Sequence, residues 1–415
     1  MIDVAVVGAG PAGLAAARSA AESGAAVTII DENVQPGGQI WRGGAAECKS
    51  WLHEKVRLVH GARVFDAHLG FIAIECADGK VEELEYRSLI LATGARERFL
   101  PFPGWTLPNV MGAGGLQALA KGALPIAEKK VVVAGSGPLL LAVGSYLREH
   151  GAEVRLVAEQ AGRSSLLRFG LALTRSPNKA RQAARLRASL RGIPYQTGCW
   201  PLAAHGSEKL ESVTLRRGSR TWTEPCDYLA CGFGLVPNTE LAALLGCRIE
   251  EGVAVDEHQR TSVPGVYSAG EATGIGGLDL SLIEGEIAGF AAAGREEDAR
   301  RRFADRDSHR RFANALEKAF ALRSELQKLP QDSTMICRCE DVTWGRVRAC
   351  QSWREAKLQT RCGMGPCQGR VCGAALEFLL GSKAESVRPP VFPVRIGSLV
   401  RYRADEKETA TDGHR

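Results

Sequence analysis

The chain has 415 residues, of which 45% are hydrophobic and 24% are charged, and its formal net charge is +6. This length predicts two or three domains. The small net charge argues against a nucleic-acid-binding platform and against a polybasic membrane anchor. Because the N-terminus enters an apolar strand at Ile2 without a basic or cleavable apolar leader, we expect a cytoplasmic protein with no obligate membrane insertion.

The N-terminal segment has the strand, glycine-rich turn, helix and second strand that are typical of a dinucleotide-binding fold. Its key residues are Gly8, Gly10, Gly13, Asp31 and Glu32. Gly8 permits the tight turn, Gly10 lets the backbone approach a pyrophosphate, and Gly13 lets the helix pack closely on the strand. Asp31 stands where a carboxylate accepts hydrogen bonds from ribose hydroxyls. The order of these features predicts dinucleotide binding.

The same pattern recurs at residues 130–159, with Gly135 and Gly137 in the turn and Glu159 at the end of the second strand. Leu140 replaces the third glycine, so the helix cannot lie as close to the turn. The architecture is therefore duplicated. Three interpretations of this second site are possible: it binds NAD(H), it binds another adenine nucleotide such as ATP, or it is weakened and binds no nucleotide.

Two further strands end in glycine, one at Thr93-Gly94 between the two fingerprints and one at Gly270-Glu271 after the second. This order predicts an α/β fold of two Rossmann-like domains, one inserted into the other. We place the first domain at residues 1–125 and 236–295 and the second at 126–235.

Residues 1–295 resemble the two-dinucleotide-domain flavoproteins, which include the glutathione, thioredoxin and ferredoxin reductases. The resemblance implies that the first domain binds FAD. Glu271 stands where the family usually has Asp. The chain has no CxxC pair, so disulfide reduction is not expected. The cofactor-binding residues that the resemblance implies are Gly8, Gly10, Gly13, Asp31, Glu32, Gly37, Gly38, Gln39, Arg42, Thr93, Gly94, Gly270 and Glu271.

A charged segment with helical periodicity at 296–330 is interpreted as a helical linker. Six of the twelve cysteines follow, at positions 337, 339, 350, 362, 367 and 372. A disulfide framework is disfavoured in a reducing compartment. Four thiolates and a glycine-rich loop suit a [2Fe–2S] cluster, whereas structural zinc sites usually pair two C-x₂₋₄-C knuckles. The pattern favours an iron–sulfur cluster, with zinc and a metal-free thiol cluster as alternatives.

The cysteine region is similar to the small [2Fe–2S] domains of the bacterioferritin-associated ferredoxin type. "CRCEDVTWGRV", "TRCGMGPCQGRVC", "DENVQPGGQIWR" and "ATGARERFLPFPGW" also resemble the alpha subunits of opine oxidases, hydrogen cyanide synthase and D-hydroxyproline or proline dehydrogenases. The resemblance implies a [2Fe–2S] domain at 331–385, a C-terminal tail at 386–415, and Cys337, Cys339, Cys367 and Cys372 as ligands. Cys362 stands where the family motif tolerates Ala, and we expect it to face away from the iron.

The sequence has no recognisable catalytic grouping, and its eight histidines are scattered singly. The resemblance implies an electron-transferring subunit of a heteromeric amino-acid or opine dehydrogenase. Its partner would be a flavin-containing beta subunit that binds and oxidises the amino-acid-derived substrate. The resemblance also allows a small gamma subunit as a third chain. The alternatives are a self-sufficient NAD(P)H-dependent reductase that passes electrons out through the cluster, and a scaffold for the partner. No nucleic-acid partner is expected.

Overall fold

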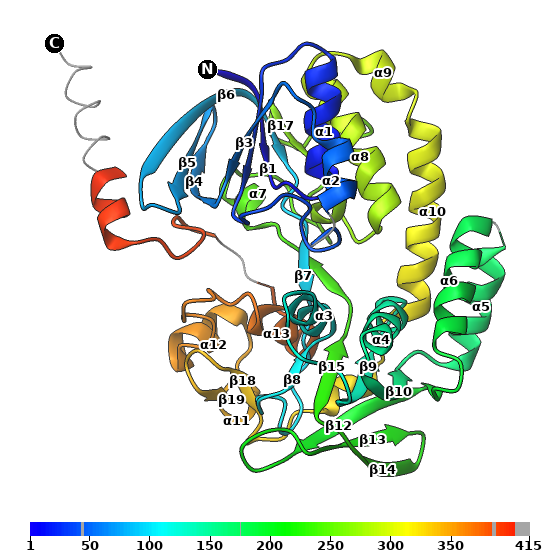
Figure 1. The fold of residues 1–415 in the computed structure, drawn as a ribbon. Coiled ribbons are helices and arrows are strands. Elements are labelled where there is room, and N and C mark those ends of the chain that lie inside the picture. Colours follow the sequence, from blue (N-terminus) through cyan, green and yellow to red (C-terminus); the bar gives the residue numbers. More distant parts are fainter. Residues whose placement is uncertain (43–44, 175, 384–386, 403–415) are drawn as a thin grey trace. The chain divides into compact units, whose positions relative to one another are not determined.

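A computed structural model gives the fold (Figure 1). It describes residues 1–42, 45–174, 176–383 and 387–402, without the side chains of 45–47. The chain divides into two compact units: unit 1 comprises 1–95, 237–310 and the C-terminal residues from 386, and unit 2 comprises 96–236 and 311–385. Two parts of the expected tail lie outside the described residues, namely residue 386 and residues 403–415, which include His414.

Unit 1 contains a seven-stranded sheet in the order β3-β2-β1-β6-β5-β4, with β17 paired to β6. β1 runs parallel to β2 and β6, so that Val6 lies opposite Ile29 and Ile90. β1 and β2 are apolar runs because a parallel sheet is covered on both faces, whereas β6 carries charged residues in its first half, where it pairs with the antiparallel strand β5. The strands are β1 Ile2–Val7, β2 Val27–Asp31, β3 Val56–His60, β4 Ala62–His68, β5 Phe71–Cys76, β6 Val81–Leu91 and β17 Val266–Ser268.

The helices of unit 1 pack closely where their sequences are rich in small residues. α1 begins at Pro11, directly after Gly10, because proline fits the first helical turn. A Cβ atom on Gly285 or Gly289 of α8 would overlap a backbone carbonyl of α1, so glycine is needed there. The helices are α1 Pro11–Glu22, α2 Ala45–Trp51, α7 Glu240–Leu244, the 3-10 turn η1 Gly270–Ala272, α8 Leu278–Ala292 and α9 Glu296–Arg300; α10 Phe303–Phe320 begins here and ends in unit 2.

Unit 2 contains a five-stranded parallel sheet in the order β11-β10-β9-β15-β8 and an antiparallel sheet β12-β13-β14. Two short pairs, β7 with β16 and β18 with β19, complete the pattern. The sheet of unit 1 is mixed, because β4, β5 and β6 pair antiparallel. The parallel strands in each unit, with a glycine turn after β1 and after β9, confirm the predicted α/β fold with two Rossmann-like domains. The strands are β7 Ala95–Glu97, β8 Val110–Gly112, β9 Lys130–Gly135, β10 Glu153–Glu159, β11 Tyr195–Thr197, β12 Cys199–His205, β13 Ser212–Arg217, β14 Arg220–Pro225, β15 Tyr228–Gly232, β16 Leu235–Pro237, β18 Met335–Cys337 and β19 Val342–Thr343.

The cysteine region lies in unit 2 and is tied to the rest of that unit. The indole Nε1 of Trp105 donates a 2.6 Å hydrogen bond to the Met335 carbonyl, and Arg96 Nε donates to the Arg370 carbonyl at 3.1 Å. The helices of unit 2 are α3 Ala113–Lys121, α4 Leu139–Glu149, α5 Arg163–Leu173, α6 Pro177–Ser189, η2 Ser324–Lys328, α11 Trp344–Val347, α12 Trp353–Thr360 and α13 Cys372–Leu380.

The compact units differ from the expected domain limits in two places. Residues 96–125 were expected in the first domain, but they lie in unit 2, where β8 pairs with β15 of the second parallel sheet. The expected linker at 296–330 is divided between the units at residue 310, within α10. The remaining limits, including the separate cysteine domain at 331–385, stay predictions.

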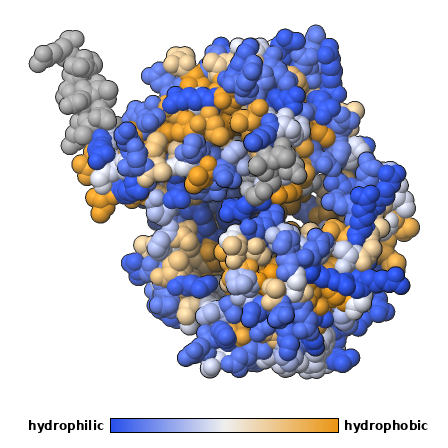
Figure 2. Space-filling view, viewed as in Figure 1, coloured by the Kyte–Doolittle hydropathy of each residue, from blue (hydrophilic) through white to orange (hydrophobic). Residues whose placement is uncertain are grey.

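None of the described helices combines the length and hydrophobicity that crossing a bilayer requires. Figure 2 shows hydrophilic residues over much of the face in view, with hydrophobic residues in separate groups between them.

Candidate functional site

The first glycine turn combines two glycines that the fold requires with one that it does not. Gly8 has a φ of +105°, and its Cβ would overlap the Ala92 carbonyl oxygen. A Cβ on Gly13 would overlap the carbonyl of Gly8. Gly10 is extended, and the nearest described atom to its Cβ position, apart from chain neighbours, is Gly38 Cα at 4.0 Å. The turn is therefore open at Gly10.

Asp31 holds this turn from the end of β2. Its Oδ2 accepts the N–H of Ala9 at 2.5 Å, and its Oδ1 accepts the backbone and side-chain N–H groups of Asn33 at 2.7 and 2.8 Å. Glu32 instead lies on the surface and forms a 3.0 Å ion pair with Arg63. The structure thus brings Asp31 to the turn and directs Glu32 away from it.

The "PGGQ" loop lies against the same turn. The Gly37 N–H donates to the Ala9 carbonyl at 2.7 Å, and a Cβ on Gly38 would lie 3.1 Å from Gly10 Cα. Gln39 and Arg42 are exposed, with Arg42 3.5 Å from the Asn33 side chain. Gly37 and Gly38 therefore join the turn through their backbone, whereas Gln39 and Arg42 lie at its edge.

Thr93 and Gly94 are clamped by Asn238, which sequence analysis missed. The Thr93 hydroxyl donates to the Asn238 carbonyl at 2.6 Å, and Asn238 Nδ2 donates to the Thr93 carbonyl at 2.9 Å. The Asn238 N–H also donates to the Gly94 carbonyl at 2.9 Å. Asn238 carries no motif, because it acts on a turn that lies 145 residues earlier.

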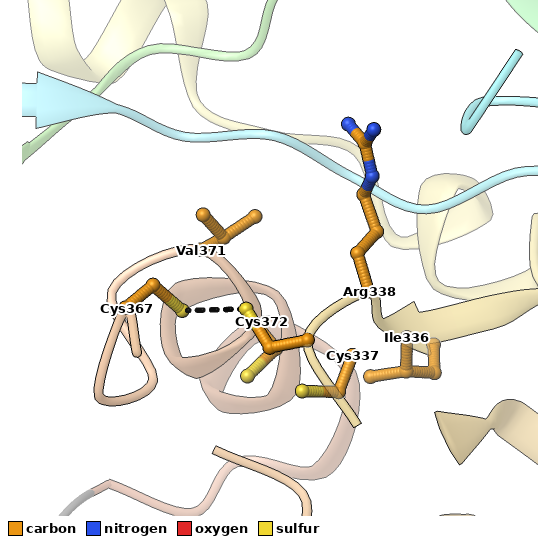
Figure 3. Close-up of a pocket in the computed structure, with 7 residues that line it drawn as sticks. Ile336, Cys337, Arg338, Cys367, Val371 and Cys372 are labelled. Atoms are coloured by element: carbon orange, nitrogen blue, oxygen red, sulfur yellow. Dashed lines mark hydrogen bonds between the residues drawn. The ribbon is translucent and has the colours of Figure 1, made fainter. Parts of the chain in front are cut away.

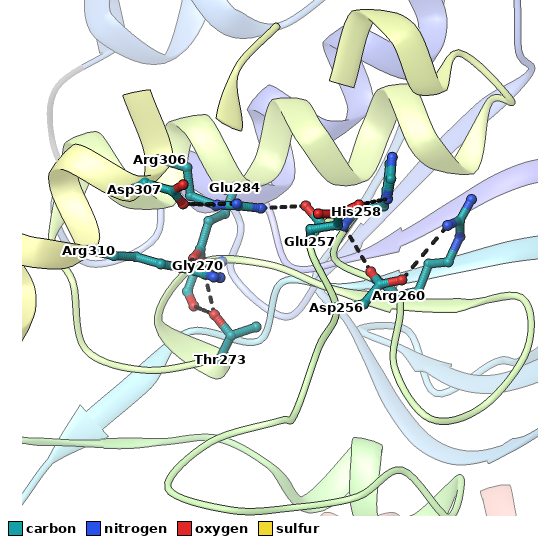
Figure 4. Close-up of polar contacts among 10 residues, drawn as sticks. All are labelled: Asp256, Glu257, His258, Arg260, Gly270, Thr273, Glu284, Arg306, Asp307 and Arg310. Atoms are coloured by element: carbon teal, nitrogen blue, oxygen red, sulfur yellow. Dashed lines mark hydrogen bonds and ion pairs between the residues drawn. The ribbon is translucent and has the colours of Figure 1, made fainter. Parts of the chain in front are cut away.

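A second missed residue, Glu284 of α8, supports the Gly270-Glu271 turn (Figure 4). Glu284 is 2% exposed. One carboxylate oxygen accepts the Gly270 N–H at 3.1 Å and the Thr273 hydroxyl at 2.9 Å. The other accepts two N–H groups of Arg310, at 2.8 and 3.1 Å. An acid within the small apolar helix of residues 278–292 was the available signal for such a role.

Glu271 itself is half-buried in η1, the turn that precedes α8. Burial raises the pKa of its carboxyl group, and the N–H of Gly277 opposes that shift. The structure therefore places an acid beside the N-terminus of α8, at the position that sequence analysis assigned to a flavin contact.

The second glycine turn, in unit 2, is occupied by groups of the protein. Glu159 is fully buried, and its two oxygens accept the N–H groups of Gly137 and Ala161, each at 2.8 Å. Burial raises the pKa of Glu159 to about 7. Gly135 lies so close to Gly232 that a Cβ would overlap the carbonyl oxygen of Gly232. A ribose would therefore reach the Glu159 carboxylate only after a local rearrangement.

The segment that follows α10 lies on this second turn. The Ser136 hydroxyl donates to the Phe320 carbonyl at 2.8 Å. Gln160 Nε2 donates to Ser136 Oγ at 2.9 Å and to the Ala321 carbonyl at 3.2 Å. The polar side chains beside the turn are therefore already hydrogen-bonded within unit 2.

The four cysteines assigned as ligands line one pocket of about 240 Å³. Cys337 ends β18, Cys372 begins α13, and Cys339 and Cys367 lie in the adjacent loops. The Sγ atoms of Cys339 and Cys367 are 3.6 Å apart. In Figure 3 the sulfur atoms of Cys337, Cys367 and Cys372 face a common space, whereas the Arg338 guanidinium points away.

The loop around Cys367 favours a thiolate at that position. Burial raises the pKa of the Cys367 thiol, but backbone N–H groups of Val371, Gly369 and Arg370 together with Cys339 lower it below its usual range. A Cβ on Gly365 would overlap the Cys339 side chain, so only glycine allows the loop to approach this closely. The loop therefore supplies both the thiols and the N–H donors that a metal–sulfur centre uses.

The two remaining cysteines of the region differ from each other. Cys350 is placed apart, with its Sγ 4.0 Å from the Arg346 carbonyl. Cys362 is fully buried, and its Sγ lies within 4.8 Å of those of Cys337 and Cys372. Cys362 was expected to face away from the iron, but its side chain lies beside two of the proposed iron ligands, after a turn at Arg361 with a φ of +65°.

Comparisons with known proteins identify the family of the chain. Residues 2–296 match the pyridine nucleotide-disulphide oxidoreductase family. The A subunit of opine oxidase from Rhizobium meliloti (strain 1021) is 33% identical over 96% of this chain and 98% of its own length. The HcnB subunit of hydrogen cyanide synthase from Pseudomonas aeruginosa is 32% identical over 88% of this chain and 90% of its own.

Two solved structures share the fold. L-proline dehydrogenase from P. horikoshii superposes with a TM-score of 0.66 at 21% identity, covering 96% of this chain and 79% of that one. Thioredoxin reductase from T. acidophilum superposes with a TM-score of 0.57 at 22% identity, covering 71% of this chain and 98% of that one. The second match confirms the predicted thioredoxin reductase-like fold.

Proposed function

Because the chain belongs to the pyridine nucleotide-disulphide oxidoreductase family, together with its opine oxidase and HcnB relatives, we propose that it is the electron-transferring subunit of a heteromeric amino-acid or opine dehydrogenase. The family implies FAD, and the chain is an FAD-dependent oxidoreductase. The relatives are named as subunits, so a partner chain is implied. In our proposal that partner is a flavin-containing beta subunit, which binds and oxidises the substrate.

The first glycine turn fits the FAD that the family implies. Among the described residues no side chain caps the N-terminus of α1, so its N–H groups suit a pyrophosphate beside the open Gly10. Asp31 would orient the ribose through its remaining lone pairs. Thr93 and Gly94, which Asn238 holds in place, would lie along the rest of the FAD molecule.

The cysteine pocket fits a [2Fe–2S] cluster in the chemistry of its donors. Two thiolates on one tetrahedral metal lie about 3.8 Å apart when each metal–sulfur bond is about 2.3 Å. The 3.6 Å Cys339–Cys367 pair meets that requirement, and the Cys337 and Cys372 Sγ atoms lie within 4.8 Å of each other. In our proposal these four residues would hold the cluster.

The presence of four convergent cysteines on the same chain as an FAD-type fold is the observation that carries this proposal. Bound FAD exchanges two electrons and a [2Fe–2S] cluster exchanges one at a time. In our proposal the residues of this chain hold both groups. Gly10 and Asp31 bind the FAD, Glu284 fixes the Gly270 turn, and the N–H donors near Cys367 stabilise the negative charge of the cluster sulfurs. None of these residues needs to touch the amine that is oxidised.

The alternative is a self-sufficient NAD(P)H-dependent reductase with a nucleotide at the second turn. Two observations weigh against it. Glu159 has no exposed surface, whereas Asp31 of the first turn retains 7%, and the second turn is already hydrogen-bonded to the last residue of α10 and the residue after it. We therefore propose that the second dinucleotide-type domain has a structural role in this chain.

Subunit dependence tests the main proposal. The isolated, FAD-loaded chain should not reduce an artificial dye with proline, hydroxyproline or an opine, whereas a complex co-purified through a tag on this chain should do so with its own substrate. Substantial dye reduction by the isolated chain would overturn the assignment.

An anaerobic titration separates the proposal from the alternative. Stoichiometric NADH or NADPH should leave the flavin absorption unchanged, while dithionite in the same cuvette should bleach it and so show that the flavin is competent. Bleaching by stoichiometric NADH would establish the reductase instead.

The ligand assignment has its own test. Serine at Cys337, Cys339, Cys367 or Cys372 should remove the visible absorption of the cluster and about two irons per chain. Serine at Cys350, which lies apart from the pocket, is the matched control and should retain both. Retention of a full cluster in any of the four variants would exclude that residue from the ligand set.

A further inference from the structure

Cys362 is the one cysteine near the pocket that the proposed cluster does not use. It follows α12, its N–H donates to the Thr360 hydroxyl at 3.2 Å, and it is fully buried. Its Sγ forms a triad with those of Cys337 and Cys372, in which all three sulfurs lie within 4.8 Å of one another. The triad is distinct from the set that lines the pocket, but it shares two of its members.

The triad has the composition of a site for a single soft metal ion. Thiolates select Zn²⁺ and Cu⁺ over hard cations. Two thiolates on one Zn²⁺ lie about 3.8 Å apart, so the sulfurs need to move by about 1 Å or less. The three residues come from separate elements, namely β18, the turn after α12 and the first residue of α13. These elements bring the three thiols together.

We propose that Cys337, Cys362 and Cys372 bind one Zn²⁺ ion when the chain lacks its cluster. Binding releases the thiol protons and forms three Zn–S bonds, with no change in oxidation state. A water molecule would complete the tetrahedron as the fourth ligand.

The consequence for assembly rests on the proposed function. Because Cys337 and Cys372 belong to both sets, the zinc ion and the cluster exclude each other. Zinc holds the cluster-free site closed and keeps its buried thiols unreactive, and iron loading requires its release. Cys362 is then an assembly residue and not a ligand of the finished cluster.

Two alanine variants separate the sites. Iron-free protein, kept anaerobic and reduced, is titrated with Zn²⁺ against a chromophoric chelator, and the same preparations are reconstituted with iron and sulfide. Wild type should bind one zinc ion. Cys362→Ala should lose at least tenfold in zinc affinity but still acquire about two irons and the visible absorption. Cys339→Ala should bind zinc within threefold of wild type but fail to form the cluster.

Further controls keep the outcome decisive. Cys350→Ala should match wild type in both titrations, and Cys362→Ser, which preserves side-chain volume, should repeat the zinc result if the alanine variant is less stable. Zinc added before reconstitution should slow cluster formation in wild type and not in Cys362→Ala.

Zinc binding by Cys362→Ala with wild-type affinity would overturn the triad, as would loss of zinc binding in Cys339→Ala. Loss of the cluster in Cys362→Ala would instead overturn the four-cysteine ligand set of the proposed function, and the two failures are therefore distinguishable.

Discussion

Gly10 and Gly13 belong to one turn, but they have different surroundings. A Cβ on Gly13 would overlap the Gly8 carbonyl oxygen, whereas the Cβ position of Gly10 has 4.0 Å to its nearest neighbour, Gly38. The backbone of Gly10 has an extended conformation that any residue type can adopt. Loss of cofactor and loss of fold can therefore be separated at residues three positions apart.

We expect Gly10→Val to fold with wild-type circular dichroism but to lose bound FAD, because its side chain fills the space that a pyrophosphate needs. Gly13→Ala should be destabilised by about 1–3 kcal/mol or more through overpacking. FAD released on denaturation and the urea midpoint measure the two effects. Full FAD occupancy in Gly10→Val would contradict the assignment of this turn.

Glu159 makes the free energy of unfolding depend on pH, and the sign of this dependence follows from the direction of its pKa shift. Its pKa is raised from 4.5 to about 7 in the folded chain, so the folded state binds the proton more tightly than the unfolded state does. Its stabilising contribution is complete below pH 4.5 and is lost as the pH rises through 7. The loss amounts to about 3 kcal/mol at most.

Urea unfolding at pH 5 and pH 8 measures this contribution. The decrease in unfolding free energy between the two values should be larger in wild type than in Glu159→Gln, which does not titrate. Equal decreases in both proteins would mean that Glu159 is ionised throughout this range.

At the scale of the elements, α1 and α8 lie together because glycines face the α1 backbone. Gly285 faces the Ala12 carbonyl and Gly289 faces that of Ala16. Gly170 of α5 offers a contrast, since it is exposed and no described atom lies within 4 Å of its Cβ position.

Gly285→Ala should therefore be destabilised by about 1–3 kcal/mol, because the added methyl group forces the two helices apart. Gly170→Ala, the matched control, should be stabilised by up to about 1 kcal/mol through helix propensity. Thermal melts of both variants provide the measurement. A neutral Gly285→Ala would show that the helices can separate without cost.

Local spacing was enough to predict the glycine turns and the acids that follow them, whereas the choice of four of the six cysteines, which line one pocket, came from the family resemblance. It could not predict partners that are distant in the chain, such as Asn238 on Thr93 or Arg310 on Glu284. The placement of residues 110–121 also depended on a three-residue strand, β8, which is too short to carry a pattern of its own. The direction of Cys362 depended on one left-handed residue, Arg361.

At the scale of the whole molecule, the residues proposed to bind FAD all belong to unit 1, and each unit has its own hydrophobic cores. FAD should therefore raise the unfolding transition of unit 1 alone, by about 2.7 kcal/mol at a free concentration 100 times its Kd. Calorimetry of FAD-free and FAD-loaded chain tests this, with Gly10→Val as the control that should not respond. An equal shift of every transition would contradict it.

The chain passes between the two units at residues 95, 236, 310 and 385, so neither unit is a continuous segment. The last described residues, near Tyr402, pack against Phe65 of β4. During synthesis at about 5–20 residues per second, β4 leaves the ribosome roughly 15–60 s before this partner does. The part of the N-terminal sheet around Phe65 therefore stays uncovered on the nascent chain for that time, as exposed hydrophobic surface of the kind that chaperones protect.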